Sequence, residues 1–270
     1  MNQPRCQILL TNDDGIESPG LWAAAQALSK LGFVTVAAPR DQASGTGRSL
    51  PITSDGRITL RKLQIGSQEW QAYAVGGTPA QVVLHALHEL LPERPDLVVS
   101  GINYGENIGE GITVSGTVGA AMEAAGNFIP ALAMSLQIDP QEDYYGYSRR
   151  VDFSAAAYFT EYFARQILEK KLPPDVDLLK VDVPDGATQQ TPWKITRVSR
   201  QRYFEPYVIR QGSLEEPGMI SATIQPDEQK LEPDGDIRAV IFDRVVSVTP
   251  VSLDMTARVD FDEMRRLLGG

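Results

Sequence analysis

The feature that most constrains the fold is the regular alternation of short apolar runs with helix-like segments. Residues 7–11 (QILLT) and 33–38 (FVTVAA) are typical of strands buried on both faces, and residues 18–31 between them carry leucine and alanine at helical spacing. A strand, a helix and a second strand in this order predict a right-handed parallel unit.

The alternation continues over the first two thirds of the chain. Further strands are predicted at 96–100 (DLVVS), 130–135 (PALAMS) and 178–183 (LLKVDV), and further helices at 78–91, 118–125 and 152–172. Strands that alternate with helices in this way indicate an α/β fold with a doubly wound, mostly parallel sheet.

The pattern changes at two places. An insertion at about 51–75 alternates as a small hairpin would, and after about residue 184 the chain becomes rich in charged residues and proline. We therefore divide the chain into a core at 1–184 and a strand-rich C-terminal extension at 185–270. Within the extension we predict antiparallel strands and a short helix, at 194–199, 203–210, 237–249 and 263–268. We expect the extension to pack on the core or on a second subunit.

The composition excludes several classes of protein. The 35 acidic residues against 25 basic ones give a net charge of −10, which disfavours sequence-specific binding to nucleic acid. The single cysteine, Cys6, excludes a disulfide framework, and two histidines are too few for three-histidine zinc chemistry. No run approaches the roughly 18 apolar residues of a membrane span, and no leader-like segment opens the sequence. We therefore expect a cytoplasmic protein with no membrane partner.

Polar segments follow the predicted strands at the edge of the sheet where ligands of α/β proteins bind. Residues 12–14 (NDD) come directly after the first strand, and Asn103 follows a later one. The other two segments are 44–47 (SGTG) and 115–117 (SGT). Because parallel strands place their carboxyl ends at one edge, we expect these segments to converge.

Asp13 and Asp14 are adjacent carboxylates, and two like charges this close are unfavourable unless a cation or strong donors compensate them. With neutral oxygens from Ser44 and Asn103 they form an all-oxygen set, which suits Mg²⁺, Mn²⁺ or Ca²⁺ rather than zinc. The alternative is structural: Asp13 would cap the following turn, and Asp14 would pair with an arginine.

Residues 115–117 open a predicted helix directly after a glycine-rich loop. Free backbone N–H groups, the helix dipole and two hydroxyls at this place would bind a phosphate group. The alternative is a plain N-cap, in which the Ser115 or Thr117 hydroxyl only satisfies the backbone of the helix.

Other catalytic templates are absent from the sequence. Gly111 and Gly116 have the spacing of a P-loop, but its lysine is missing, and neither G-x-G-x-x-G nor G-x-S-x-G follows a strand. These absences argue against a P-loop ATPase, a dinucleotide dehydrogenase and an α/β-hydrolase. Tyr144, Tyr145 and Tyr147 would form either a lid that stacks a base or an ordinary surface loop.

Six segments of the sequence match one known family. They are ILLTNDDGIESPGL (8–21), APRDQASGTGRSL (38–50), GGTPAQVV (76–83), PDLVVSGINYGENIGEGITVSGTVGAAMEAAG (95–126), VDVP (181–184) and VVSVTPVSLDMTA (245–257). In these segments the chain resembles the SurE (survival protein E) family, the metal-dependent 5'/3'-nucleotidases. The resemblance implies a Rossmann-like catalytic core, a C-terminal extension exchanged between subunits, and a homodimer or homotetramer.

The resemblance also implies one divalent cation per subunit, magnesium or manganese, held by Asp13, Asp14, Ser44 and Asn103. The chain departs from the usual family pattern at a few other positions. Alanine replaces arginine at 43, glycine replaces serine at 47, aspartate replaces asparagine at 182, and Asp-Gly-Asp replaces Gly-Thr-Asp at 234–236. None of these changes falls on the four metal positions.

Our hypothesis is metal-assisted hydrolysis of nucleoside 5'-monophosphates, with 3'-monophosphates as a further substrate class, to nucleoside and phosphate. Asp13 and Asp14 are the candidate catalytic residues, and either could orient the attacking water. The candidate phosphate-binding residues are Asn12, Gly45, Thr46, Ser115, Gly116 and Thr117. The alternatives are an exopolyphosphatase and a non-catalytic nucleotide-binding module.

Overall fold

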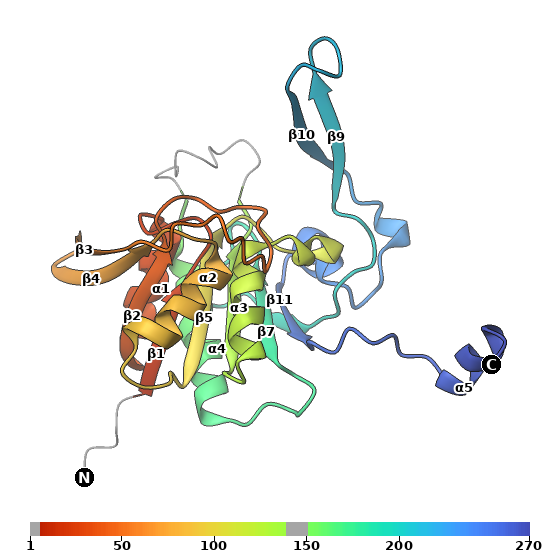
Figure 1. Ribbon diagram of the computed structural model, residues 1–270. Coiled ribbons are helices and arrows are strands. Elements are labelled where there is room, and N and C mark those ends of the chain that lie inside the picture. Colours follow the sequence, from red (N-terminus) through yellow and green to blue (C-terminus); the bar gives the residue numbers. More distant parts are fainter. Residues whose placement is uncertain (1–5, 139–150) are drawn as a thin grey trace.

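A nine-stranded sheet forms the centre of the computed structural model, which describes residues 6–138 and 151–270 (Figure 1). From one edge to the other, its strands are β3 (Ile58–Ile65), β4 (Gln68–Val75), β2 (Gly32–Pro39), β1 (Cys6–Thr11), β5 (Leu97–Tyr104), β6 (Ala131–Leu136), β7 (Leu178–Val183), β11 (Val246–Val251) and β8 (Trp193–Ile195). Tyr144, Tyr145 and Tyr147 lie outside the described residues.

Most neighbouring strands of the sheet are parallel. The row from β4 through β2, β1, β5 and β6 to β7 is parallel throughout, whereas β3 and β11 run antiparallel to β4 and β7. The predicted α/β fold with a mostly parallel sheet is confirmed. The predicted hairpin forms as β3 and β4, and it widens the sheet because β4 pairs with β2.

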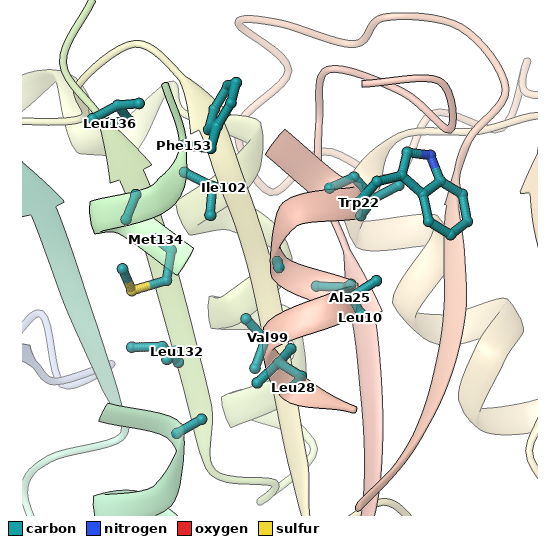
Figure 2. Close-up of a cluster of buried hydrophobic side chains, with 14 of the residues drawn as sticks. Leu10, Trp22, Ala25, Leu28, Val99, Ile102, Leu132, Met134, Leu136 and Phe153 are labelled. Carbon is teal, nitrogen blue, oxygen red and sulfur yellow. The ribbon is translucent and has the colours of Figure 1, made fainter. Parts of the chain in front are cut away.

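Helices cover both faces of the sheet. On one face lie α1 (Pro19–Leu28) and α4 (Ser154–Glu169). On the opposite face lie α2 (Pro79–His85) and α3 (Gly116–Gly126). Successive residues of a strand point to opposite faces. Leu10 therefore lies in one apolar cluster with Leu28 and Trp22 of α1 (Figure 2), whereas Leu9 lies in the cluster of α2 and α3 on the other face. This burial on two sides explains why the strands are apolar at successive positions.

Short helical turns connect the larger elements. They are η1 (Ala86–Leu90), which continues α2, and η2 (Gly109–Thr113), η3 (Glu228–Lys230) and η4 (Arg238–Phe242). None of the described helices, long or short, has the length and apolar character needed to span a membrane.

Beyond Val183 the chain adds two more strands, β8 and β11, to the central sheet. The strands predicted at 194–199 and 237–249 are shorter than expected, because β8 ends at Ile195 and the helical turn η4 precedes β11. Ile237 and Val240 are both buried in a small apolar cluster with Tyr203. Residues three apart share one face of a helix, so this packing favours a helical turn over an extended strand.

Two arms project from the body of the molecule (Figure 1). One is an antiparallel ribbon of β9 (Phe204–Arg210) and β10 (Gly218–Ile224), and the other ends in α5 (Phe261–Leu267). Strand β9 confirms the prediction at 203–210, but β10 was not predicted, because its apolar residues do not alternate regularly with polar ones. The C-terminal helix begins two residues earlier than predicted, where the Asp260 carboxylate accepts hydrogen bonds from the first backbone N–H groups.

Candidate active site

Side chains from the ends of β1 and β5 and from the start of α3 meet at one edge of the sheet. The strands β1 and β5 are parallel neighbours, with Thr11 opposite Ser100, so the residues that follow them reach the same edge. The pairing of β5 with β6 changes register between Ser100 and Asn103. Asn103 therefore lies where the regular ladder of β5 is interrupted, close to the loop that follows β1.

Thr117, in the first turn of α3, links Asp13 and Asn103. Its hydroxyl oxygen lies 2.5 Å from Asp13 Oδ1 and 3.1 Å from Asn103 Oδ1, and its backbone N–H donates to Asp13 Oδ2 at 3.1 Å. Asn103 is oriented by its own amide group, which donates to the carbonyl oxygen of Gly105 at 2.7 Å. Oxygens from two distant segments thus converge on one hydroxyl.

Gly116 allows this close approach because it has no side chain. A Cβ atom at this position would lie 2.7 Å from Asp13 Cβ and 3.1 Å from Thr46 Oγ1. The first distance is shorter than side-chain contacts in proteins allow, so any larger residue would push Asp13 away from α3. The start of α3, the turn after β1 and the loop that contains Thr46 therefore pack directly on one another.

The loop at 43–47 is fixed beside Asp13 by backbone contacts. The N–H of Ala43 donates to the carbonyl oxygen of Asp13 at 2.7 Å, and the Thr46 hydroxyl donates to the carbonyl oxygen of Ala43 at 2.7 Å. The N–H of Gly47 donates to the carbonyl oxygen of Val114, just before α3, at 2.9 Å. Ser44 is exposed, and its hydroxyl accepts a hydrogen bond from the Gln42 side chain at 3.1 Å.

Asp14 lies on the other side of the turn, toward β5. Its Oδ2 accepts a hydrogen bond from the backbone N–H of Tyr104 at 2.9 Å. Burial raises the pKa of both Asp13 and Asp14, and the charge of Asp13 raises the pKa of Asp14 further. The hydrogen bonds from Thr117 act in the opposite direction on Asp13, but burial outweighs them.

The other predicted residues occupy the edges of this cluster. Asn12 is fully buried, and its side chain closes the turn by bonding to both the N–H and the carbonyl oxygen of Gly15, at 3.2 and 3.0 Å. Asn12, rather than Asp13, therefore satisfies the turn, and the Asp13 carboxylate is directed to α3. Ser115 caps α3 by accepting the N–H of Val118 at 3.1 Å, and Gly45 is exposed in its loop. Their roles in phosphate binding stay predictions.

The chemistry of these side chains fits a hard divalent cation. Asp13 and Asp14 are only 4% and 2% exposed, and two adjacent carboxylates buried to this extent favour protonation unless a positive charge offsets them. Within the described residues no three His, Cys, Asp or Glu side chains gather into a potential metal cluster. A cation beside the two aspartates would thus complete its shell with neutral oxygens, for which Asn103 and Ser44 are the candidates.

A buried polar group next to the site was not predicted from the sequence. Lys180 and Asp182 are fully buried on β7, and Lys180 forms ion pairs with Asp182 and Asp236. Nearby, the Tyr203 hydroxyl donates to Glu106 Oε1 at 2.7 Å. The sequence carries one signal of this group: two charged residues, two positions apart, in the otherwise apolar strand LLKVDV.

Known proteins similar to this chain match it over nearly its whole length. The sequence profile of the family "Survival protein SurE" matches residues 8–205. A 5'-nucleotidase SurE from Thermococcus kodakarensis is 42% identical over 262 residues, which cover 97% of this chain and 98% of that protein. A 5'-nucleotidase SurE from Methanosarcina mazei is 41% identical over 271 residues, which cover 97% of each chain.

A solved structure also shares the whole fold. The crystal structure of the SurE protein from Aquifex aeolicus superposes with a TM-score of 0.74 at 31% identity, and the match covers 97% of this chain and 99% of that one. The match therefore extends beyond the central sheet into the C-terminal segments. On the sequence profile, the near-full-length relatives and this structure, the chain belongs to the survival protein SurE family.

Proposed function

We propose that this protein is a divalent-metal-dependent 5'-nucleotidase, which hydrolyses nucleoside 5'-monophosphates to nucleoside and phosphate. Two relatives about as long as this chain, 42% and 41% identical to it, are named 5'-nucleotidases. The single observation that carries the proposal is the convergence of Asp13 and Asn103 on the Thr117 hydroxyl, at the N-terminus of α3. This arrangement brings acidic oxygens and helix N–H groups to one place, as phosphate chemistry requires.

One cation per subunit, magnesium or manganese, would be held by Asp13, Asp14, Ser44 and Asn103. When bound, it would polarise a phosphoryl oxygen and lower the pKa of a nearby water molecule. The adjacent buried carboxylates support this assignment because their raised pKa values reflect an unfavourable charge that a cation relieves. Ser44 would contribute from its exposed position in the loop that Ala43 anchors to the Asp13 backbone.

Other groups near the cation would bind the phosphate and orient the attacking water. Backbone N–H groups of Gly45 and Thr46, and the Ser115–Thr117 segment at the start of α3, would bind the phosphate oxygens as negative charge develops on them. Asp13 or Asp14 would orient the attacking water. Asn12 would act on the site through the turn that it closes, since both ends of its amide bond to Gly15.

The test is phosphate release from a panel of 5'- and 3'-nucleotides and polyphosphate, in EDTA and then with Mg²⁺ or Mn²⁺ restored. We expect release from 5'-nucleotides that stops in EDTA and returns with the metal. Faster release from polyphosphate than from any nucleotide would replace this proposal with an exopolyphosphatase. Nucleotide binding without release under any metal would replace it with a binding module.

We further propose that the protein is a homodimer or homotetramer assembled through its two arms. Every residue of β9 is exposed, and β10 exposes large apolar side chains such as Met219 (66%) and Ile220 (76%). A two-stranded ribbon alone is marginally stable in water, so a second copy of the chain that covers these side chains would stabilise it. Light scattering after size exclusion should give a multiple of the chain mass, and Ile220→Asp should reduce it.

A further inference from the structure

Three charged side chains are completely buried beside the candidate active site. Lys180 Nζ lies 2.5 Å from Asp182 Oδ2, on the same strand, and 3.1 Å from Asp236 Oδ2, which comes from the segment before η4. Burial acts to lower the pKa of Lys180, but the charges of the two carboxylates and its hydrogen bonds to them together outweigh burial, and the pKa is raised. Lys180 is therefore a cation shared between β7 and the C-terminal part of the chain.

Both carboxylates also bind the loop that follows Asn103. Asp182 Oδ1 accepts the backbone N–H of Asn107 at 2.7 Å, and the Asp236 carboxylate accepts the backbone N–H of Gly109 at 3.1 Å. At its other end the same loop receives the Asn103 side chain, whose amide donates to the carbonyl oxygen of Gly105. A continuous set of contacts therefore runs from Lys180 to the side chain of a candidate metal ligand.

The C-terminal segment touches this loop directly. A Cβ atom at Gly109 would lie 2.9 Å from Ile237 Cδ1 and 3.0 Å from the carbonyl oxygen of Gln201, and Gly109 has a φ of +65°. Glycine is thus needed both for the backbone conformation and for the close contact. Asp236 further accepts the N–H groups of Ser199 and Ile237, so its carboxylate joins three backbone segments.

We propose that Asp236 is a positioning residue of the active site: through Gly109 and Lys180 it holds the 104–109 loop, and with it the Asn103 side chain, in place for metal binding. The expected effect of Asp236 on catalysis rests on the proposed nucleotidase function, but its expected effect on metal affinity does not. Residues that orient metal ligands typically contribute about 10- to 100-fold to metal affinity when they are tested by substitution.

Because Lys180 pairs with two carboxylates, Asp236 can be substituted without leaving the lysine unpaired. Removal of either carboxylate leaves Lys180 paired with the other one, so no buried cation is left alone. Asp236→Ala removes the acceptor for the Gly109 N–H, and Asp236→Asn keeps an oxygen that can accept it. Asp243→Ala is the matched control, because Asp243 lies in the same C-terminal region and pairs with Lys194 at 2.5 Å. Within the described part of the chain, its ion pairs do not reach the 104–109 loop.

The experiment measures Mn²⁺ affinity by electron paramagnetic resonance, amide hydrogen exchange in 103–109, and kcat and KM for AMP, in the full-length protein. We expect Asp236→Ala to weaken Mn²⁺ binding by roughly tenfold or more and to accelerate exchange in 103–109. Asp236→Asn should lose less affinity than Asp236→Ala, and Asp243→Ala should match the wild type in both measurements.

A folded Asp236→Ala variant with wild-type Mn²⁺ affinity and unchanged exchange in 103–109 would overturn the proposal, even if its melting temperature fell. If Asp236→Ala does not fold, Asp182→Ala decides the question in the same way, because it frees the Asn107 N–H while Lys180 stays paired with Asp236. If the wild type releases no phosphate from AMP, the nucleotidase proposal fails, and the affinity and exchange measurements still decide the role of Asp236.

Discussion

The turn after β1, which carries Asp13 and Asp14, and the loop after β5, which accepts the Asn103 side chain, are held in different ways. The turn after β1 is closed by one of its own residues, because the Asn12 side chain bonds to both backbone groups of Gly15. The loop after β5 is held by residues far along the chain: Asp182 and Asp236 accept its N–H groups across 75 and 127 positions. The closure of the first turn is thus a local property of the sequence, whereas the support of the second loop depends on the completed fold.

The largest expected effect comes from the residue that connects the two halves. Asp13→Ala removes the carboxylate that Thr117 joins to Asn103, and we expect phosphate release from AMP to fall by about 100-fold or more, the equivalent of a few kcal/mol of transition-state stabilisation. Glu69→Gln, on the exposed hairpin, is the control and should leave the rate unchanged. A variant that keeps a tenth of the wild-type rate would contradict the assignment.

The next effect tests the close contact between the halves. Gly116→Ala would place a Cβ atom 2.7 Å from Asp13 Cβ, so the aspartate and α3 must move apart. We expect roughly 10- to 100-fold lower activity, together with a stability loss of about 1–3 kcal/mol measured by urea unfolding. Gly111→Ala is the control, because the nearest atom to its Cβ would be 3.9 Å away. Wild-type activity and stability of both variants would show that the close contact of Gly116 with Asp13 is not needed.

Asn12→Ala tests the self-contained turn. It removes two hydrogen bonds to Gly15, and we expect the free energy of unfolding to fall by about 2 kcal/mol, at about 1 kcal/mol for each bond. Hydrogen exchange should accelerate at 12–16 and remain unchanged at 104–109. Acceleration at both loops would show that they are not held independently.

The smallest effect tests the distant support of the second loop. Tyr203→Phe removes the hydroxyl that donates to Glu106, and we expect a stability loss of about 1 kcal/mol with faster exchange at 104–109 and none at 12–16. Tyr207→Phe, on the exposed ribbon, serves as the control. Faster hydrogen exchange at 12–16 instead of 104–109 would show that Tyr203 does not support the second loop.

The same contrast explains how far the sequence could predict the molecule. The parallel strands of the core, the α/β class and the segments 12–14 and 115–117 follow from local patterns: apolar runs, a helix start and polar residues at strand ends. The support from Lys180 and Asp236 does not, because nothing local to Gly109 indicates that a residue 127 positions away will accept its N–H. Tertiary packing likewise converted part of the expected strand at 237–249 into a helical turn, since Ile237 and Val240 are buried together.

The proposed function requires that Asp13 and its neighbours form a metal-dependent catalytic site. The most direct test is a titration of Mn²⁺ against the wild type and Asp13→Asn, followed by electron paramagnetic resonance, with AMP hydrolysis measured on the same samples. We expect one bound ion per wild-type chain, hydrolysis that rises with occupancy, and loss of both in the variant. Equal Mn²⁺ binding by the two proteins, or hydrolysis that persists in EDTA, would contradict the proposed function.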